Sequence, residues 1–158
     1  LDEDRLTKIC ESLREIAHYP DPVGTVLSRN VRPNGLSIKK VCTPIGVVGV
    51  IFESRPNVAI DAGALCIRAG NSAILRCGSE SFKTSSVLIE LFTQAINSSG
   101  LPDFSVQLVP TRERSAVSEM LRMSDYIDVI VPRGGKSLVS LVQEEAKVPV
   151  TLQKHNHK

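Results

Sequence analysis

Polar residues and glycines follow three apolar runs of the chain, and their types suit the binding of anions. The segment Glu53-Ser54-Arg55-Pro56-Asn57 follows the run IGVVGVIF. Arg76 is the last residue of the run SAILR, and Ser79 comes three residues later. Gly134-Gly135-Lys136 follows the run DVIVPR. An arginine can hold a carboxylate or phosphate through two parallel hydrogen bonds, and an asparagine amide can donate to a developing oxyanion. Paired glycines before a helix let the backbone approach an anion. These residues indicate a site for an anionic ligand.

Each of these residues also has a purely structural interpretation. Arg55 can form an ion pair with Glu53 across a tight turn, and Arg76 can be a solvated side chain. Asn57 can cap the helix that follows it, which is the commoner role of an asparagine there. GGKS at 134–137 can be an ordinary glycine-rich turn with an exposed lysine, because the first glycine of a P-loop is missing and no G-x-G-x-x-G follows any predicted strand. Residue types alone leave both interpretations open.

The elements that must position these residues alternate between strand and helix. Apolar runs predict strands at 45–52, 72–77, 105–110, 126–132 and 148–152, and helical periodicity predicts helices at 59–70, 79–99, 111–123 and 135–147. Five strands joined by crossover helices predict an α/β fold with an open, doubly wound parallel sheet. Ligands of such sheets bind beyond the carboxyl ends of the strands, which is where the three polar segments fall.

The first 43 residues have a different pattern. Apolar residues from Leu6 to Ala17 recur at helical spacing, and the two prolines of HYPDPVG end that pattern. Residues 26–42 then predict a β-hairpin, because Asn34-Gly35 is a strong signal for a type I′ turn between two strands. The fold therefore begins with an N-terminal helix and a β-hairpin.

Composition excludes several classes of protein. The formal net charge is only +2, and no basic run is interleaved with aromatic residues, so we expect no nucleic-acid partner. No apolar stretch is long enough to span a membrane. Cys42, Cys66 and Cys77 lie in or beside apolar segments and are interpreted as small core residues, reduced in a cytoplasm. His155 and His157 do not predict a metal site.

Longer strings carry a specific resemblance. The strings RPNGL, PIGVVGVI, ESRPNV, GNSAILRCGSE and DVIVPRGGKSL occur in this order between about residues 1 and 150. In wording and order they resemble the gamma-glutamyl phosphate reductases, a family of the aldehyde dehydrogenase superfamily. The resemblance implies an NADPH-dependent reduction of glutamyl 5-phosphate to glutamate 5-semialdehyde in proline biosynthesis, in the cytoplasm. It also implies an open α/β cofactor domain that lacks G-x-G-x-x-G.

The resemblance assigns roles to the residues that match the family's motifs. Arg76 and Ser79 match the segment that meets the adenosine ribose, where a serine beside an arginine suits the 2′-phosphate of NADPH better than an acid would. Gly134, Gly135 and Lys136 match the turn that approaches the cofactor. Arg55 and Asn57 match the loop beside the reacting carbonyl.

The resemblance also implies a division of the chain. Residues 1–43 are expected to form the helix and an oligomerisation hairpin through which the protein can form a homo-oligomer, residues 44–152 the NADP-binding domain, and residues 153–158 a divergent tail. None of the four cysteines matches the family's nucleophile, so we expect a truncated chain without the catalytic domain, inactive on its own. The alternative expectation is a nucleotide-binding remnant or a partner subunit without reductase activity.

Overall fold

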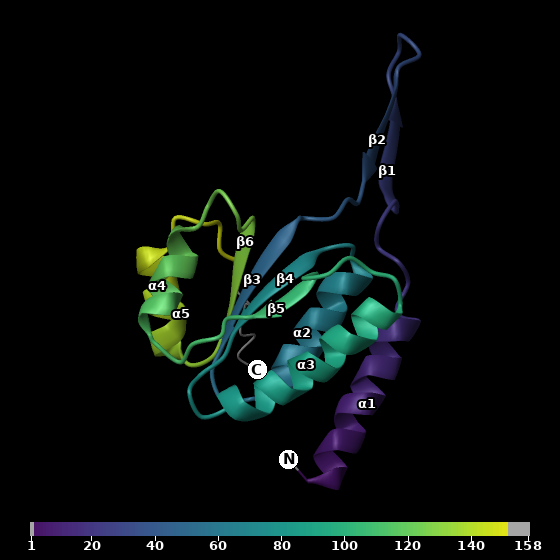
Figure 1. The fold of residues 1–158 in the computed structure, drawn as a ribbon. Helices are drawn as coiled ribbons and strands as arrows, with labels where there is room; N and C mark the ends of the chain where they lie inside the picture. The colour runs from purple at the N-terminus through teal and green to yellow at the C-terminus, as the bar shows by residue number, and fades with distance from the viewer. Residues whose placement is uncertain (1, 152–158) are drawn as a thin grey trace, which may run out of the picture.

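The computed structural model describes residues 2–151 and arranges them as a parallel sheet between helices, with a hairpin arm at one corner (Figure 1). No helix within this part of the chain has the length and apolar character needed to cross a membrane. The elements, in chain order, are α1 (Glu3–His18), β1 (Val26–Val31), β2 (Ser37–Val41), β3 (Val47–Phe52), α2 (Asn57–Arg68), β4 (Ser72–Arg76), α3 (Phe82–Ser98), β5 (Val106–Leu108), α4 (Ser115–Arg122), β6 (Val129–Arg133) and α5 (Lys136–Glu145).

The main sheet has four parallel strands in the order β5-β4-β3-β6, which confirms the predicted fold class. The predicted fifth strand is wrong within the described residues: Val150 forms only an isolated parallel bridge with Ile130. The reason is local, because the N–H groups of Lys147 and Val148 both donate to the carbonyl of Leu121 on α4. Residues 147 and 148 are therefore held against the end of α4, and of the described residues that follow α5 only Val150 pairs with β6. Residues 152–158, which include the whole of the predicted tail at 153–158, lie outside the described part.

Side-chain alternation along the strands divides the core into two layers. Val48, Val50 and Phe52 of β3 pack with the apolar sides of α2 and α3, and Ile9 of α1 joins this cluster. Ile51, between them in sequence, points to the opposite face and packs with α4 and α5. Figure 1 shows α2 and α3 on one side of the sheet and α4 and α5 on the other. Helices thus cover both faces, as a parallel sheet requires.

The helix α1 is confirmed and packs on α2. The Asp2 side chain caps its N-terminus by accepting from the N–H of Arg5 at 2.9 Å, and Glu3 adds negative charge in the first turn. Its buried residues are Ile9 and Ile16, one on each half of the helix. Along this contact the Ser12 hydroxyl donates to the Asp61 carboxylate of α2 at 2.8 Å. The N-terminal helix therefore forms part of the body of the molecule.

The hairpin is confirmed, but its turn is not the predicted type I′. Residues 32–36 form a five-residue loop in which the N–H of Gly35 donates to the carbonyl of Arg32 at 2.9 Å. Gly35 has a φ of 84°, whereas Phe104 is the one described residue other than glycine with a positive φ, so Asn34 does not adopt the conformation that a type I′ turn needs. Pro33, with its ring-fixed φ, instead occupies the second position of an ordinary turn.

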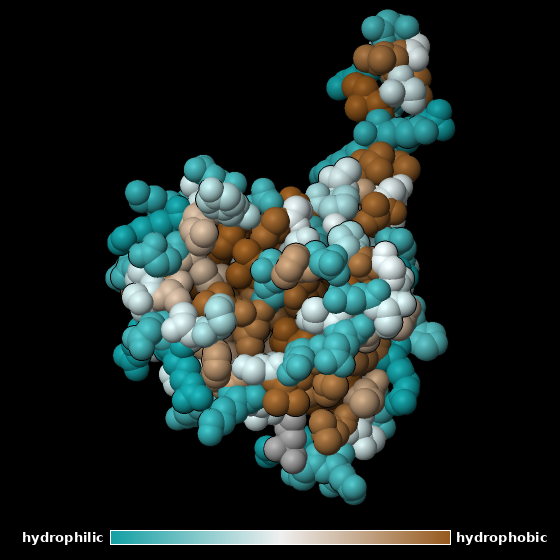
Figure 2. Space-filling view, viewed as in Figure 1, coloured by the Kyte–Doolittle hydropathy of each residue, from teal (hydrophilic) through white to brown (hydrophobic). Residues whose placement is uncertain are grey.

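Strands β1 and β2 stand away from the body, and every residue in them is exposed (Figure 1). The arm nevertheless carries large apolar side chains, visible as brown patches in Figure 2. They are Val26, Leu27, Val31, Leu36, Ile38 and Val41. A two-stranded hairpin with this composition is only marginally stable unless another surface packs against it.

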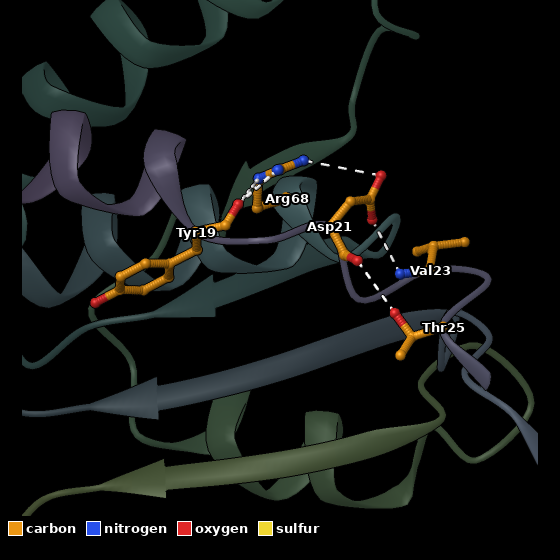
Figure 3. Close-up of polar contacts among 5 residues, drawn as sticks. All are labelled: Tyr19, Asp21, Val23, Thr25 and Arg68. Carbon is orange, nitrogen blue, oxygen red and sulfur yellow. Dashed lines mark hydrogen bonds and ion pairs between the residues drawn. The ribbon is translucent and has the colours of Figure 1, made fainter. Parts of the chain in front are cut away.

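The linker between α1 and the hairpin is held on the end of α2 by Arg68 (Figure 3). The guanidinium donates to the carbonyl of Tyr19 at 3.2 and 2.6 Å and lies 3.8 Å from the carboxylate of Asp21. Asp21 also accepts from the N–H of Val23 at 2.9 Å and, through its carbonyl, from the hydroxyl of Thr25 at 3.3 Å. These contacts fix the point from which the arm projects.

Candidate functional site

A central cleft lies between β3 and β6, two neighbouring strands whose following helices cover opposite faces of the sheet. Helix α2, which follows β3, covers one face of the sheet, while α5, which follows β6, covers the other. Such a divergence leaves a crevice at the carboxyl ends of the two strands. The cavity measures about 580 Å³ and is lined by residues 52–55 and 58 on the β3 side and 132–136, 139, 140 and 143 on the β6 side. The sequence-predicted Arg55, Gly134, Gly135 and Lys136 all line it.

Glu53, just beyond β3, forms hydrogen bonds with the segments that follow β4 and β6. Its backbone carbonyl accepts from the N–H of Gly78 at 2.9 Å and from the hydroxyl of Ser81 at 2.8 Å, both beyond β4. Its carboxylate accepts from the N–H of Gly135, which caps α5, at 2.9 Å. A carboxylate at a helix N-terminus is stabilising. Sequence reasoning missed this role, because no local signal pairs Glu53 with a glycine 82 positions away.

The glycines beside Glu53 are required by close approach. A Cβ on Gly134 would lie 2.6 Å from the Glu53 carboxyl carbon, and one on Gly78 would lie 2.8 Å from the Glu53 carbonyl oxygen. At Gly135 the same atom would be 3.8 Å from the carboxylate, which is an ordinary contact. Gly78 therefore lets the β4 end approach β3, and Gly134 leaves room for the Glu53 side chain.

Two of the structural interpretations of the ESRPN segment are wrong. No ion pair between Arg55 and Glu53 forms among the described residues, because the Glu53 carboxylate is directed at Gly135. Asn57 does not cap α2, since Pro56 already has helical backbone angles and Asn57 is the first helical residue. The Asn57 amide instead donates to the Asp61 carboxylate at 3.2 Å, one turn further along α2.

Arg76 is buried at the end of β4, so the solvated alternative is wrong. Only 7% of it is exposed, and its guanidinium donates to the carbonyls of Arg112 and Glu113 at 3.3 and 3.2 Å. Its Nε is buried with no hydrogen-bond partner. Burial lowers the pKa of Arg76, and the charge of Arg114 adds to that effect. Ser79 is exposed, three residues further along.

A second cavity, the helix cleft, lies between α1 and the start of α2. It measures about 560 Å³ and is lined by Arg5, Lys8, Ile9, Ser12, Ser54, Arg55, Pro56, Asn57 and Asp61. Ser54 and Arg55 line both clefts, so the two cavities adjoin at the ESRPN segment. The structure thus brings Asn57 to the helix cleft, separate from the glycine turn. Sequence reasoning missed this cleft, because it exists only where α1 packs on α2.

The four cysteines lie away from both clefts. Cys66 and Cys77 are buried, as predicted, and Cys10 is exposed on α1. Cys42 is only partly buried at the base of the hairpin, so its assignment to the core is wrong. Burial raises the pKa of the Cys66 thiol from 9.0 to about 11, which keeps it protonated and unreactive at neutral pH. None of the four lines either cavity.

Comparison with known proteins gives consistent matches. A model of the aldehyde dehydrogenase family matches residues 3–154. A gamma-glutamyl phosphate reductase of Beijerinckia indica is 58% identical over 151 residues, which are 95% of this chain and 35% of that protein. Solved gamma-glutamyl phosphate reductases of Thermotoga maritima and Saccharomyces cerevisiae, each 35% identical, superpose with TM-scores of 0.91 and 0.85; they cover 95% and 99% of this chain and 36% and 39% of theirs. The chain spans about a third of the length of the curated relatives it matches.

Proposed function

The chain belongs to the aldehyde dehydrogenase family, and from that premise we propose that it carries the nucleotide-binding part of a gamma-glutamyl phosphate reductase. Such an enzyme uses NADPH to reduce glutamyl 5-phosphate to glutamate 5-semialdehyde in proline biosynthesis. The observation that carries the proposal is the central cleft, which places residues 53–55 opposite the turn at 132–136 at the carboxyl ends of β3 and β6. Relatives named gamma-glutamyl phosphate reductase support the reaction class.

The central cleft fits a dinucleotide. Gly134 and Gly135 present backbone at the start of α5, where first-turn N–H groups have no acceptor within the helix. The Glu53 carboxylate already accepts from the N–H of Gly135, so a phosphate would bind to the other N–H groups of this first turn. The exposed Lys136 adds a cation beside it. We assign Gly134, Gly135 and Lys136 to cofactor binding; when bound, NADPH would supply the hydride.

Arg76 and Ser79 are proposed to set the preference for NADPH over NADH. Ser79 is exposed just beyond β4, and no acid occupies that position to repel a 2′-phosphate. Arg76, with its buried and unpartnered Nε, supplies positive potential beside it. Arg55 and Asn57 are proposed to face the substrate, because Arg55 lines both cavities and Asn57 lines the helix cleft.

We also propose a cytoplasmic homo-oligomer. The four cysteines are all unpaired thiols, which favours a reducing compartment. The apolar residues of the hairpin arm are the proposed contact between copies.

A second proposal concerns the 158-residue polypeptide alone: it binds the nucleotide but does not catalyse the reduction. The placement of the cysteines favours this, since none lines a cavity where a thiolate could meet a substrate. The assay is glutamate semialdehyde-dependent reduction of NADP in the presence of phosphate. Turnover that is abolished by thiol alkylation would contradict this proposal.

The cofactor assignment is tested with Ser79→Glu, which adds a negative charge at an exposed position. We expect NADPH to bind at least about tenfold more weakly to this variant, because the carboxylate repels the 2′-phosphate, while NADH binding changes little. Ser124→Glu, at an exposed turn far along the chain, is the matched control. Equal loss of both cofactors, or of neither, would contradict the assignment. The affinities of Arg76→Ala for both cofactors are measured in the same way. Its free energy of unfolding is measured too, because Arg76 is buried and its removal can destabilise the fold.

A further inference from the structure

The helix cleft contains charged groups of both signs on two different elements. Arg5, Lys8 and Ser12 recur at helical spacing and therefore share one face of α1. On the other wall, Asp61 points its carboxylate toward α1, where it accepts from the Ser12 hydroxyl at 2.8 Å and from the Asn57 amide at 3.2 Å. The cavity of about 560 Å³ is large enough for a small metabolite.

The charges that line the helix cleft favour a zwitterionic ligand over a purely anionic one. Lys8 and Arg55 provide cations that attract a carboxylate or phosphate, and Arg5, whose Nε lies 3.8 Å from the Asp2 carboxylate, adds a third positive charge. A ligand with only negative charges would, however, be repelled by Asp61, while a ligand with an ammonium group can donate to it. A carboxylate can accept several hydrogen bonds, so Asp61 can take a further donor besides Ser12 and Asn57. A zwitterion with adjacent ammonium and carboxylate groups matches both signs.

The position of the cleft relates such a ligand to the cofactor site. Ser54 and Arg55 line both cavities. A ligand whose charged end lies between α1 and α2 would therefore extend past Arg55 toward the central cleft.

We propose, on the premise of the reductase function above, that the helix cleft binds the α-ammonium and α-carboxylate groups of an amino-acid substrate. Asp61 accepts from the ammonium group, and the cations of α1 together with Arg55 hold the carboxylate. Asp61 is thus a binding residue that selects an amino acid over a simple diacid. Helix α1 then forms one wall of the substrate site as well as packing on α2.

The test is NMR titration of the ¹⁵N-labelled 158-residue chain with three matched probes. L-glutamate carries both charged groups, glutarate lacks the ammonium group, and 4-aminobutyrate lacks the α-carboxylate. We expect glutamate to shift the amides of residues 5–12 and 54–61, with the other two probes binding about tenfold more weakly, as for the loss of one charge-assisted hydrogen bond. Equal binding of all three, or no shifts in these segments, would overturn the proposal.

Two variants separate ligand binding from helix packing. Asp61→Asn is expected to lower glutamate affinity about tenfold and to leave glutarate affinity the same or higher. Asp125→Asn, at an exposed turn, serves as the control and should change nothing. Ile16→Ala weakens the burial of α1 outside the cavity lining and keeps the Asp61 carboxylate, so it should retain glutamate binding. If Ile16→Ala loses glutamate as Asp61→Asn does, packing is responsible and the proposal fails.

NADPH titration of the same samples keeps this proposal separate from the proposed function. Binding of NADPH in the central cleft, together with no response of the helix cleft to glutamate, would reject the amino-acid site alone. Failure of NADPH to bind would reject the cofactor assignment, whatever glutamate does.

Discussion

At the scale of single residues, two carboxylates organise the two clefts in different ways. Glu53 holds the first N–H of the α5 turn, and its backbone joins β3 to the end of β4. Asp61 is held by Ser12 and Asn57 and directs a negative charge between α1 and α2. The contacts of Glu53 with Gly135 and of Asp61 with Ser12 join residues far apart in the sequence, so neither role could be predicted from the sequence.

Glu53→Gln tests whether the Glu53 charge opposes a bound phosphate. The amide keeps an acceptor for Gly135 but removes the negative charge from the central cleft. NADPH affinity is expected to rise about two- to fivefold, while stability falls by about 0.3 to 1 kcal/mol from the lost interaction with the helix dipole. Fluorescence titration and urea denaturation measure the two effects, with Glu90→Gln on the exposed side of α3 as control. Weaker NADPH binding would mean that the Glu53 charge assists the cofactor.

Cys66 gives a pH dependence with a defined sign. Burial raises the pKa of its thiol in the folded protein from 9.0 to about 11, so the protonated form is favoured by folding. The resulting stability is fully present below pH 9 and is lost as pH rises toward 11, by about 2 to 3 kcal/mol. Cys66→Ala should lack this part of the decline, whatever its stability at pH 7. Parallel stability curves for the two proteins between pH 8 and 11 would contradict the assignment.

At the scale of elements, the sequence was sufficient for most of the sheet and for the edge where ligands bind. Buried strands have continuous apolar runs, and polar residues at their exits marked the central cleft. The turn of the hairpin was mispredicted because Pro33 sets the backbone before Asn34, and the fifth strand because Leu121 binds residues 147 and 148. The burial of Arg76 depends on the segment before α4, which has no local signal in the sequence.

Gly78→Ala tests how closely the β3 and β4 exits must approach. The added Cβ would lie 2.8 Å from the carbonyl oxygen and 3.1 Å from the carbonyl carbon of Glu53, and backbone at a strand end cannot move aside cheaply. We expect a loss of about 2 kcal/mol in the free energy of unfolding. Gly135→Ala, whose Cβ meets nothing closer than 3.8 Å, is the control and should cost under about 0.5 kcal/mol. Similar losses in both variants would contradict this account of Gly78.

At the scale of the whole molecule, the body and the arm have different surfaces. The body buries two apolar layers around its sheet, whereas the arm exposes its apolar residues on both strands. The contacts of Arg68 hold the base of the arm on α2, so the arm has a defined origin from which to reach another surface (Figure 3).

Ile38→Glu tests whether the arm joins copies of the chain. A charge in a buried contact between arms is costly, so the variant should dissociate at concentrations where the wild type associates. Ser37→Glu is the matched control, because it changes the neighbouring residue on the opposite face of β2 and should leave association intact. Light scattering across a concentration series measures the effect. A monomeric wild type at high concentration would contradict the role of the arm.

The most direct test of the central claim is to map where NADP⁺ binds on the ¹⁵N-labelled 158-residue chain. The account predicts saturable binding, with the largest amide shifts at residues 53–58, 76–81 and 133–140, which surround the central cleft and the adjoining end of β4. Residues of the arm, at 26–41, should not shift. Absence of binding at millimolar NADP⁺, or the largest shifts at the amino ends of the strands or in the arm, would contradict the claim that this edge of the sheet is a nucleotide site.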